Sequence, residues 1–266
     1  MSSRTITSLG NPTVKAVRAL HMRKEREETG LFLAEGLKIV TEAVELGHAP
    51  RYLLHGPDAA EHPLTRAAAA MTLAHGGEVL EVNRDILEKV SRKENPQAVV
   101  GVFRQTFTPL SDIEPGSAPC WVALEAVRDP GNLGTIIRTA DAAGCGGVIL
   151  VGDCCDPYSV EGVRATMGSI FAVPVARATV EEFLAWRRDW PGSVVGTLLT
   201  ASVNQHSADY RAPTLILMGN EAQGLPPELA EACDVNVKIP MRGRADSLNL
   251  SVATGIMIYA VTDRLL

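Results

Sequence analysis

The chain of 266 residues is 46% apolar and 21% charged, values typical of globular proteins, which excludes a disordered, collagen-like or coiled-coil chain. This length suits two domains of about 100–150 residues each. No apolar run approaches the ~18–20 residues of a membrane span. The N-terminal sequence Met-Ser-Ser-Arg-Thr-Ile-Thr lacks the apolar core of a secretory signal. We therefore expect a cytoplasmic protein with no membrane partner.

The cysteines predict neither a metal site nor disulfide bonds. The five of them include no Cys-x-x-Cys pair, and their number is odd. We expect reduced thiols, buried as small apolar side chains in a cytosolic protein, and no metal.

The net charge of −6 hides a basic cluster near the N-terminus. Over the whole chain the acidic balance argues against a nucleic-acid partner. However, residues 1–105 are net +1, whereas residues 119–266 are net −5. The cluster lies within about three helical turns and contains Lys15, Arg18, Arg23, Lys24 and Arg26. Two interpretations remain open: a solvated helix face offset by neighbouring glutamates, or an RNA-binding surface.

The first part of the chain, residues 1–105, alternates between helical and strand patterns. Asn11 and Pro12 are typical of a helix start, with Asn as the N-cap and Pro at the first helical position. The elements that follow are a strand at 31–34, a helix at 36–46, a strand at 52–54, a helix at 58–73, a strand at 79–82, a helix at 84–91 and a strand at 98–103. This alternation predicts one small α/β domain whose sheet is covered by helices.

Residues 106–118 contain two prolines and a glycine without periodicity, which predicts a linker. A second alternation occupies residues 119–266. Its predicted strands are 121–125, 147–151, 171–175, 194–199, 214–219 and 235–239, and its predicted helices are 133–143, 157–169, 179–188, a short one from Pro226, and 247–264. This order predicts a second α/β domain with a parallel sheet.

Three segments of the second domain are rich in glycine and polar residues where a strand ends. The first, 129–141, enters a helix whose buried stripe leaves Arg138 pointing to the rim or to a ligand. Asn132 is either a plain N-cap or a functional residue. Because ligands bind at the carboxyl ends of parallel strands, this position favours a binding site. The glycines of the segment 129–141 do not match the G-x-G-x-x-G dinucleotide fingerprint, which argues against a Rossmann-type nucleotide enzyme.

The second segment, 215–227, runs from a buried strand into Gly219-Asn220-Glu221 and then Gly224. Glycine there lets a ligand approach the backbone, and a Glu directly after a core strand must be solvated, paired or functional. In the third segment, 239–253, Ser247 is a natural N-cap that exposes backbone N–H groups. Asn249 would then lie in the first helical turn, where it is a poor helix former.

Together these segments read N-x-G-T-I-I-R-T-A, G-N-E-x-x-G-L and I-P-M-x-G-x-x-x-S-L-N-x-S-V-A. In this order they resemble the three motifs of the SpoU group of SPOUT RNA 2′-O-ribose methyltransferases. The segment 163–169 is similar to that family's intervening element. Residues 8–15 and 31–37 resemble the L30e-like α/β/α substrate-binding domain that often precedes the SpoU domain. The resemblance therefore covers nearly the whole chain.

The resemblance implies a trefoil knot in the C-terminal part of the chain, in contrast to the usual unknotted chain. It also implies S-adenosylmethionine as cofactor (S-adenosylhomocysteine as product) without a metal, a homodimer through the catalytic domain, and RNA as substrate. Ribosomal RNA is favoured as the substrate because the N-terminal domain resembles a ribosomal RNA binder, and tRNA is the alternative substrate. A second alternative is an RNA-binding protein without catalytic activity, but the intact motif residues argue against it. With aromatic residues at 5%, base-stacking platforms are not expected to carry recognition.

The same resemblance assigns roles to individual residues. Arg138 would engage the 2′-hydroxyl, either as a base, as family proposals have it, or as a group that orients the ribose and stabilises alkoxide charge. Its permanently protonated guanidinium favours the second role. The other implied catalytic residues are Asn132, Glu221, Ser247 and Asn249. The implied cofactor-binding residues are Thr200, Gly219, Asn220, Ile239, Met241 and Leu248. The implied RNA-binding residues are Lys15, Arg18, Arg23 and Lys24.

Overall fold

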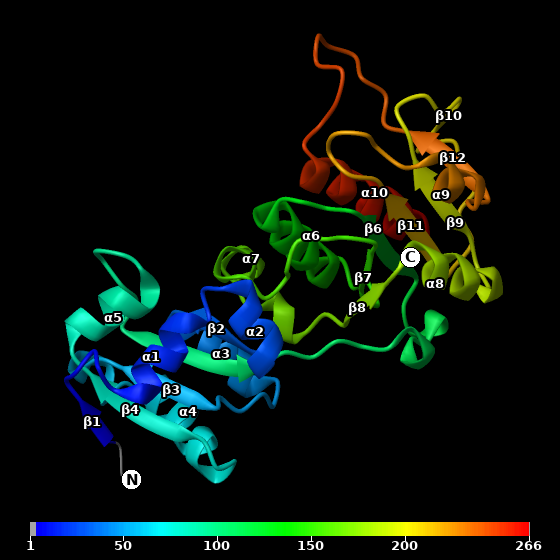
Figure 1. Ribbon diagram of the computed structural model, residues 1–266. Coiled ribbons are helices and arrows are strands. Elements are labelled where there is room, and N and C mark those ends of the chain that lie inside the picture. The colour runs from blue at the N-terminus through cyan, green and yellow to red at the C-terminus, as the bar shows by residue number, and fades with distance from the viewer. Residues whose placement is uncertain (1–3, 266) are drawn as a thin grey trace. The chain divides into compact units, whose positions relative to one another are not determined.

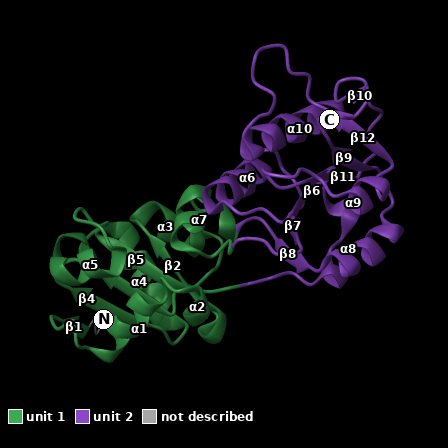
Figure 2. Ribbon diagram, turned by 45° about the horizontal axis from the view of Figure 1, so that its top comes forward, with its two compact units in different colours: residues 1–105, 156–171 green, residues 106–155, 172–266 purple. Residues whose placement is uncertain are grey.

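The computed structural model describes residues 4–265 and divides into two compact units (Figure 2). Unit 1 contains the residues up to 105 together with 156–171. Unit 2 contains 106–155 and the residues from 172 onward. The first boundary between the units lies at residue 105, where the predicted linker begins, and residues 156–171, from within the segment 119–266, belong to unit 1.

The sheet of unit 1 has the strand order β1-β4-β3-β5-β2 (Figure 1). Its strands are β1 (Arg4–Ile6), β2 (Leu31–Glu35), β3 (Tyr52–His55), β4 (Glu78–Val82) and β5 (Val99–Arg104). β1, β4 and β3 run parallel, whereas β5 is antiparallel to both β3 and β2. The predicted α/β class is confirmed, but β1 was missed, because three residues are too few for a period-two pattern.

The helices of unit 1 are α1 (Pro12–Ala19), α2 (Arg23–Thr29), α3 (Leu37–Glu45), α4 (Pro63–Ala74) and α5 (Arg84–Ser91), with a 3₁₀ turn at Pro57–Ala59. Of these, α1, α3 and α5 begin within one residue of their predicted starts, whereas α4 begins at Pro63 instead of 58 and α2 was not predicted. The Asn11 side chain accepts hydrogen bonds from the N–H groups of Thr13 and Val14, as predicted. The basic cluster does not form one helix, because the backbone becomes extended at Met22 (φ −89°, ψ 131°). Its residues are divided between α1 and α2.

Residues 156–171 form α7 (Val160–Thr166) and a 3₁₀ turn (Ser169–Phe171) that pack into unit 1. The ring of Tyr158 lies 4.6 Å from that of Phe32 on β2. Asp156 Oδ2 accepts from Arg26 Nε and Nη2, at 2.7 Å each, and both side chains are buried. α7 is shorter than the predicted helix 157–169, because the left-handed residue Met167 (φ 53°) ends it.

The sheet of unit 2 has the strand order β10-β12-β9-β11-β6-β7-β8, and its pairings are parallel. Its strands are β6 (Cys120–Glu125), β7 (Val148–Val151), β8 (Val175–Ala178), β9 (Val194–Thr197), β10 (Val203–Asn204), β11 (Thr214–Met218) and β12 (Val235–Lys238). The predicted parallel sheet is confirmed. β8 begins at Val175 instead of 171, because Phe171 ends the 3₁₀ turn that packs into unit 1.

The helices of unit 2 are α6 (Pro130–Ala142), α8 (Val180–Trp186), α9 (Pro227–Glu231) and α10 (Leu250–Leu265). The linker contains 3₁₀ turns at Leu110–Asp112 and Pro115–Ser117, and another follows α8 at Arg187–Asp189. α6 packs against α10, and α10 also contacts β11 and β6 at the centre of the sheet (Figure 1). This packing brings the first and third polar segments of the sequence together. Within residues 4–265, no helix is long and apolar enough to cross a membrane.

Candidate active site

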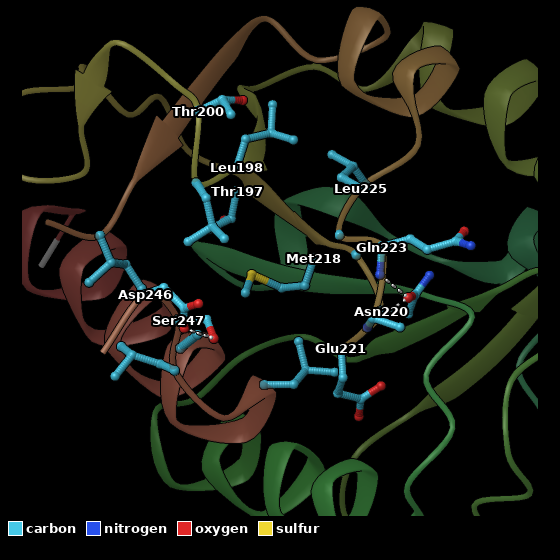
Figure 3. Close-up of a pocket in the computed structure, with 18 of the residues that line it drawn as sticks. Thr197, Leu198, Thr200, Met218, Asn220, Glu221, Gln223, Leu225, Asp246 and Ser247 are labelled. Carbon is cyan, nitrogen blue, oxygen red and sulfur yellow. Dashed lines mark hydrogen bonds between the residues drawn. The ribbon is translucent and has the colours of Figure 1, made fainter. Parts of the chain in front are cut away.

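The loops that follow β9, β11 and β12 enclose a cavity of about 430 Å³ (Figure 3). These strands are neighbours in the parallel sheet, so their carboxyl ends meet at one edge. The lining residues are Thr197–Thr200, Met218–Leu225, Ile239, Met241, Asp246–Leu248, Leu250 and Ala253. The volume falls within the roughly 300–1,000 Å³ of small-molecule sites, and the lining combines apolar side chains with a few polar groups.

The loop after β11 needs glycine for close packing of its two ends. A Cβ on Gly219 would lie 2.0 Å from the Gly224 carbonyl carbon and 2.1 Å from the Leu225 nitrogen. Gly224 itself has φ +70°, in the left-handed region. The Asn220 Oδ1 atom accepts from the N–H groups of Ala222 (3.1 Å) and Gln223 (2.9 Å), which holds the turn closed. This loop is therefore a tightly folded wall of the cavity.

Glu125 anchors the same loop from the neighbouring strand β6. Its Oε2 atom accepts a hydrogen bond from Asn220 Nδ2 at 2.9 Å, and its exposed fraction is 9%. Sequence reasoning missed Glu125. Its position could have revealed it, because a Glu at the end of a buried apolar strand has to be solvated, paired or functional. The same argument had singled out Glu221.

Three side chains connect the three polar segments beside the cavity. Asn249 Nδ2 donates to Asn132 Oδ1 at 2.9 Å, and Asn132 Nδ2 donates to Glu221 Oε1 at 3.0 Å. Asn132 comes from α6, Glu221 from the loop after β11, and Asn249 from the residue before α10. The network fixes the orientation of both amides and directs one Glu221 oxygen toward α6.

The predicted helix cap at Ser247 is wrong, and Asn132, for which a plain N-cap was one of two interpretations, is not a cap either. The cap of α6 is Asp129, whose Oδ1 atom accepts from the Asn132 N–H at 2.6 Å, so the Asn132 side chain is available for the network. The cap of α10 is Asn249 and not Ser247. Asn249 Oδ1 accepts from the N–H groups of Ser251 (2.9 Å) and Val252 (3.4 Å). The Ser247 hydroxyl instead donates to Asp246 Oδ1 at 3.2 Å.

Arg138 lies on the exposed face of α6, away from the buried stripe of that helix, as the periodicity predicted. Among the described residues it forms no hydrogen bond or ion pair, and it does not line the cavity. The structure therefore brings Asn132, Glu221 and Asn249 together and leaves the Arg138 guanidinium in solvent.

All six residues assigned to cofactor binding line the cavity. They are Thr200, Gly219, Asn220, Ile239, Met241 and Leu248. Glu221 and Ser247 line it as well. Thr197, which sequence reasoning missed, lines the cavity as well, and its buried hydroxyl has no hydrogen-bond partner within residues 4–265. In the same part of the chain, no cluster of His, Cys, Asp or Glu could hold a metal ion.

The residues assigned to RNA binding differ in their pairing. Arg23 donates to Glu27 at 2.7 Å, and Lys24 lies 3.6 Å from Glu28, so the acidic residues of α2 offset both charges. Lys15 and Arg18 on α1 have no ion-pair partner in the part of the chain that the structure describes. Arg26 is buried against Asp156 and unavailable to any ligand.

Comparison with known proteins identifies the chain. Residues 119–259 match the SpoU rRNA Methylase family, and residues 11–101 match the MRM3-like substrate binding domain. The chain belongs to the SpoU rRNA methylase family. The resemblance inferred from the three motifs is thereby confirmed.

Several relatives of this family are similar over nearly their full length. One is the 23S rRNA (guanosine(2553)-2′-O)-methyltransferase RlmP of Bacillus subtilis, 32% identical over 96% of this chain and 97% of its own. Another is the 23S rRNA (uridine(2479)-2′-O)-methyltransferase of Streptomyces viridochromogenes, 33% identical over 99% and 94%. The crystal structure of an AdoMet-bound rRNA methyltransferase from Sinorhizobium meliloti is 51% identical over 99% of both chains, with a TM-score of 0.93.

Proposed function

We propose that this protein transfers a methyl group from S-adenosylmethionine to the 2′-hydroxyl of one ribose in 23S ribosomal RNA, in the cytoplasm. The observation that carries the proposal is the Asn249–Asn132–Glu221 network, which joins the three family motifs at the edge of the cavity. RlmP and the Streptomyces enzyme, by their names, methylate 23S rRNA at this position of the ribose.

The cavity fits S-adenosylmethionine in size and in the chemistry of its wall. When bound, the cofactor supplies a methyl group on a sulfonium, which is already an excellent leaving group. Gly219, Ile239 and Leu248 would hold it largely through their backbone groups. Because the leaving group needs no further activation, the protein has mainly to align and polarise the ribose hydroxyl.

The residues around the cavity divide this work between them. The network fixes Asn132 and Asn249 so that the nucleotide meets a preset polar wall, completed by Glu221 and Ser247. Arg138, unpaired on α6, orients the ribose or an adjacent phosphate and stabilises the developing alkoxide charge. Unit 1, with Lys15 and Arg18 unpaired on α1, contributes affinity for the RNA.

We further propose a homodimer through unit 2. α10 carries an exposed apolar stripe, with exposed fractions of 51% for Val252, 36% for Ile256 and 46% for Tyr259. Their spacing of four and three residues places them on one face of the helix, which a second copy would cover. Light scattering should give twice the mass of one chain. The variant Ile256→Glu places a charge on this face and should give the mass of a single chain. The trefoil knot of the family is proposed for the loops that share the cavity.

The direct test supplies the purified protein with methyl-labelled S-adenosylmethionine and an unmodified RNA transcript. We expect label in 23S rRNA, at one position that becomes resistant to alkaline cleavage because its 2′-oxygen is methylated. A tRNA transcript serves as the comparison. Label in the tRNA alone would replace 23S rRNA by the alternative substrate. Binding of cofactor and RNA without transfer to either would identify a catalytically silent RNA-binding protein.

A further inference from the structure

The loop between β12 and α10 carries two arginines on an otherwise acidic unit. Unit 2 contains ten Lys and Arg against sixteen Asp and Glu. A polyanion that approaches this unit meets net repulsion, so it can bind only where cations are locally concentrated. Arg242 and Arg244, on either side of Gly243, form such a site, with Asp246 as the one acidic residue of their loop.

The position of this pair relative to the cavity follows from its neighbours in the loop. Met241 on one side and Asp246 and Ser247 on the other line the cavity, whereas Arg242 and Arg244 do not. Residues 242–249 are exposed, and a Cβ on Gly243 would meet no atom within 4 Å. Figure 1 shows this loop, in orange and red, projecting from β12 before it returns to α10. The arginines therefore lie at the rim of the cavity, in the exposed part of the loop that helps to close it.

Neither guanidinium is neutralised by the protein. Within residues 4–265, Arg242 and Arg244 form no hydrogen bond or ion pair. Asp246, their nearest acidic neighbour in the chain, accepts from the Ser247 hydroxyl. An unpaired guanidinium presents planar donors that match two oxygens of one phosphate.

We propose that Arg242 and Arg244 bind backbone phosphates of the RNA next to the ribose that is methylated. The inference rests on the proposed function and goes beyond it, because it adds to Arg138 two further RNA contacts of unit 2, at positions that the third motif leaves unspecified. Two phosphate contacts at the rim would offset the acidic surface of the unit and hold the strand while its ribose enters the site. Such contacts carry no base specificity.

The test compares the double variant Arg242→Ala/Arg244→Ala with the wild type in filter binding of an unmodified 23S rRNA transcript. We expect the RNA Kd to rise about tenfold or more, and the slope of log Kd against log salt to fall by about one for each phosphate that is no longer bound. The Kd for S-adenosylmethionine, measured by calorimetry, should not change. Arg242→Lys/Arg244→Lys keeps both charges and should retain most of the salt slope.

Arg188→Ala provides the matched control, since Arg188 is an exposed arginine of unit 2 that lies outside the cavity loops. It should leave the RNA Kd unchanged. An unchanged RNA Kd and salt slope in the double alanine variant would overturn the inference. So would an equal rise of the RNA Kd in Arg188→Ala, or a loss of cofactor affinity in the double variant. A wild type that transfers no methyl group to RNA would instead overturn the proposed function.

Discussion

The amide of Asn220 lies between two strands: its nitrogen donates to Glu125 Oε2 at 2.9 Å, and its oxygen accepts from the turn that follows it. Glu125 ends β6, and Asn220 lies two residues after the end of β11, the strand paired with β6 in parallel. The buried Glu125 carboxylate thus holds the loop after β11 in place, although Glu125 does not itself line the cavity. Glu125 is a positioning residue, acting through Asn220.

Substitution of Glu125 tests this role. Glu125→Ala leaves the Asn220 amide without its acceptor, at a cost of about 1–3 kcal/mol. We expect the Kd for S-adenosylmethionine to rise about tenfold in calorimetry. Glu125→Gln keeps an oxygen that can accept the same hydrogen bond and should restore most of the affinity. Equal affinity in the wild type and Glu125→Ala would contradict the role.

The two exposed loops of the cavity offer a matched pair of glycine substitutions. Gly219→Ala places a methyl group 2.0 Å from backbone atoms, which forces the loop open, whereas Gly243→Ala meets empty space. We expect the first to abolish detectable cofactor binding in calorimetry and the second to leave it unchanged. Wild-type affinity in Gly219→Ala would show that this loop does not shape the cofactor site.

Substitution of Arg138 should separate catalysis from folding. An exposed helical Arg changed to Ala should alter stability within roughly ±0.5 kcal/mol. Loss of a group that stabilises transition-state charge should lower the rate by about 10²–10³. Arg138→Lys keeps the charge without the planar fork and should recover little. Single-turnover methylation, thermal melts and cofactor titration measure the three properties.

Asp141→Ala, on the same exposed face of α6, is the control and should methylate normally. A near wild-type rate for Arg138→Ala would remove Arg138 from the mechanism. A much lower melting temperature would show that the residue is structural.

Two arginines of α2 should differ strongly in their contribution to stability. Arg26→Ala removes the guanidinium that neutralises the buried Asp156 carboxylate and should cost about 3–5 kcal/mol. Arg23→Ala breaks an exposed pair with Glu27 and should cost less than about 1 kcal/mol. Urea unfolding followed by circular dichroism gives both values. The three tryptophans lie in unit 2, so their fluorescence follows that unit separately. Similar costs for the two variants would contradict the assignment.

Acid should destabilise unit 1 through His21. Burial lowers the pKa of His21 below its ordinary 6.5, and the neighbouring Arg92 and Arg26 lower it further, against the opposing effects of the Val90 carbonyl and Glu35. The unfolded chain therefore takes up the proton first as the pH falls. The stability from neutral His21 is complete above pH 6.5 and is lost progressively below it.

His21→Gln removes this titration, so its urea midpoint should depend less on pH than that of the wild type between about pH 7.5 and 5.5. Identical pH dependence of the two proteins would rule out His21 as the source.

Local patterns were sufficient for most of the elements. Apolar periodicity and the Asn11 cap act within one or two turns of the chain, and they predicted most of the helices and strands, although not α2. The strands β1 and β10 are too short to show an alternating pattern. The break between α1 and α2 at Met22 has no Gly or Pro that would have predicted it. The position of the cavity was also predictable, because glycine-rich polar segments after apolar strands meet at one edge of any parallel sheet.

The sequence by itself determined which residues follow each strand of the parallel sheet, and so which could line the cavity. Only the tertiary structure decided which of them pair. Packing of α6 against α10 brings Asn249 to Asn132 across 117 residues, and Arg26 reaches Asp156 across 130. Strand order places Glu125 beside Asn220. Such contacts depend on how whole elements pack, which local propensity does not encode. Local sequence therefore could not tell which polar residues form a helix cap, which form the network and which form the buried ion pair.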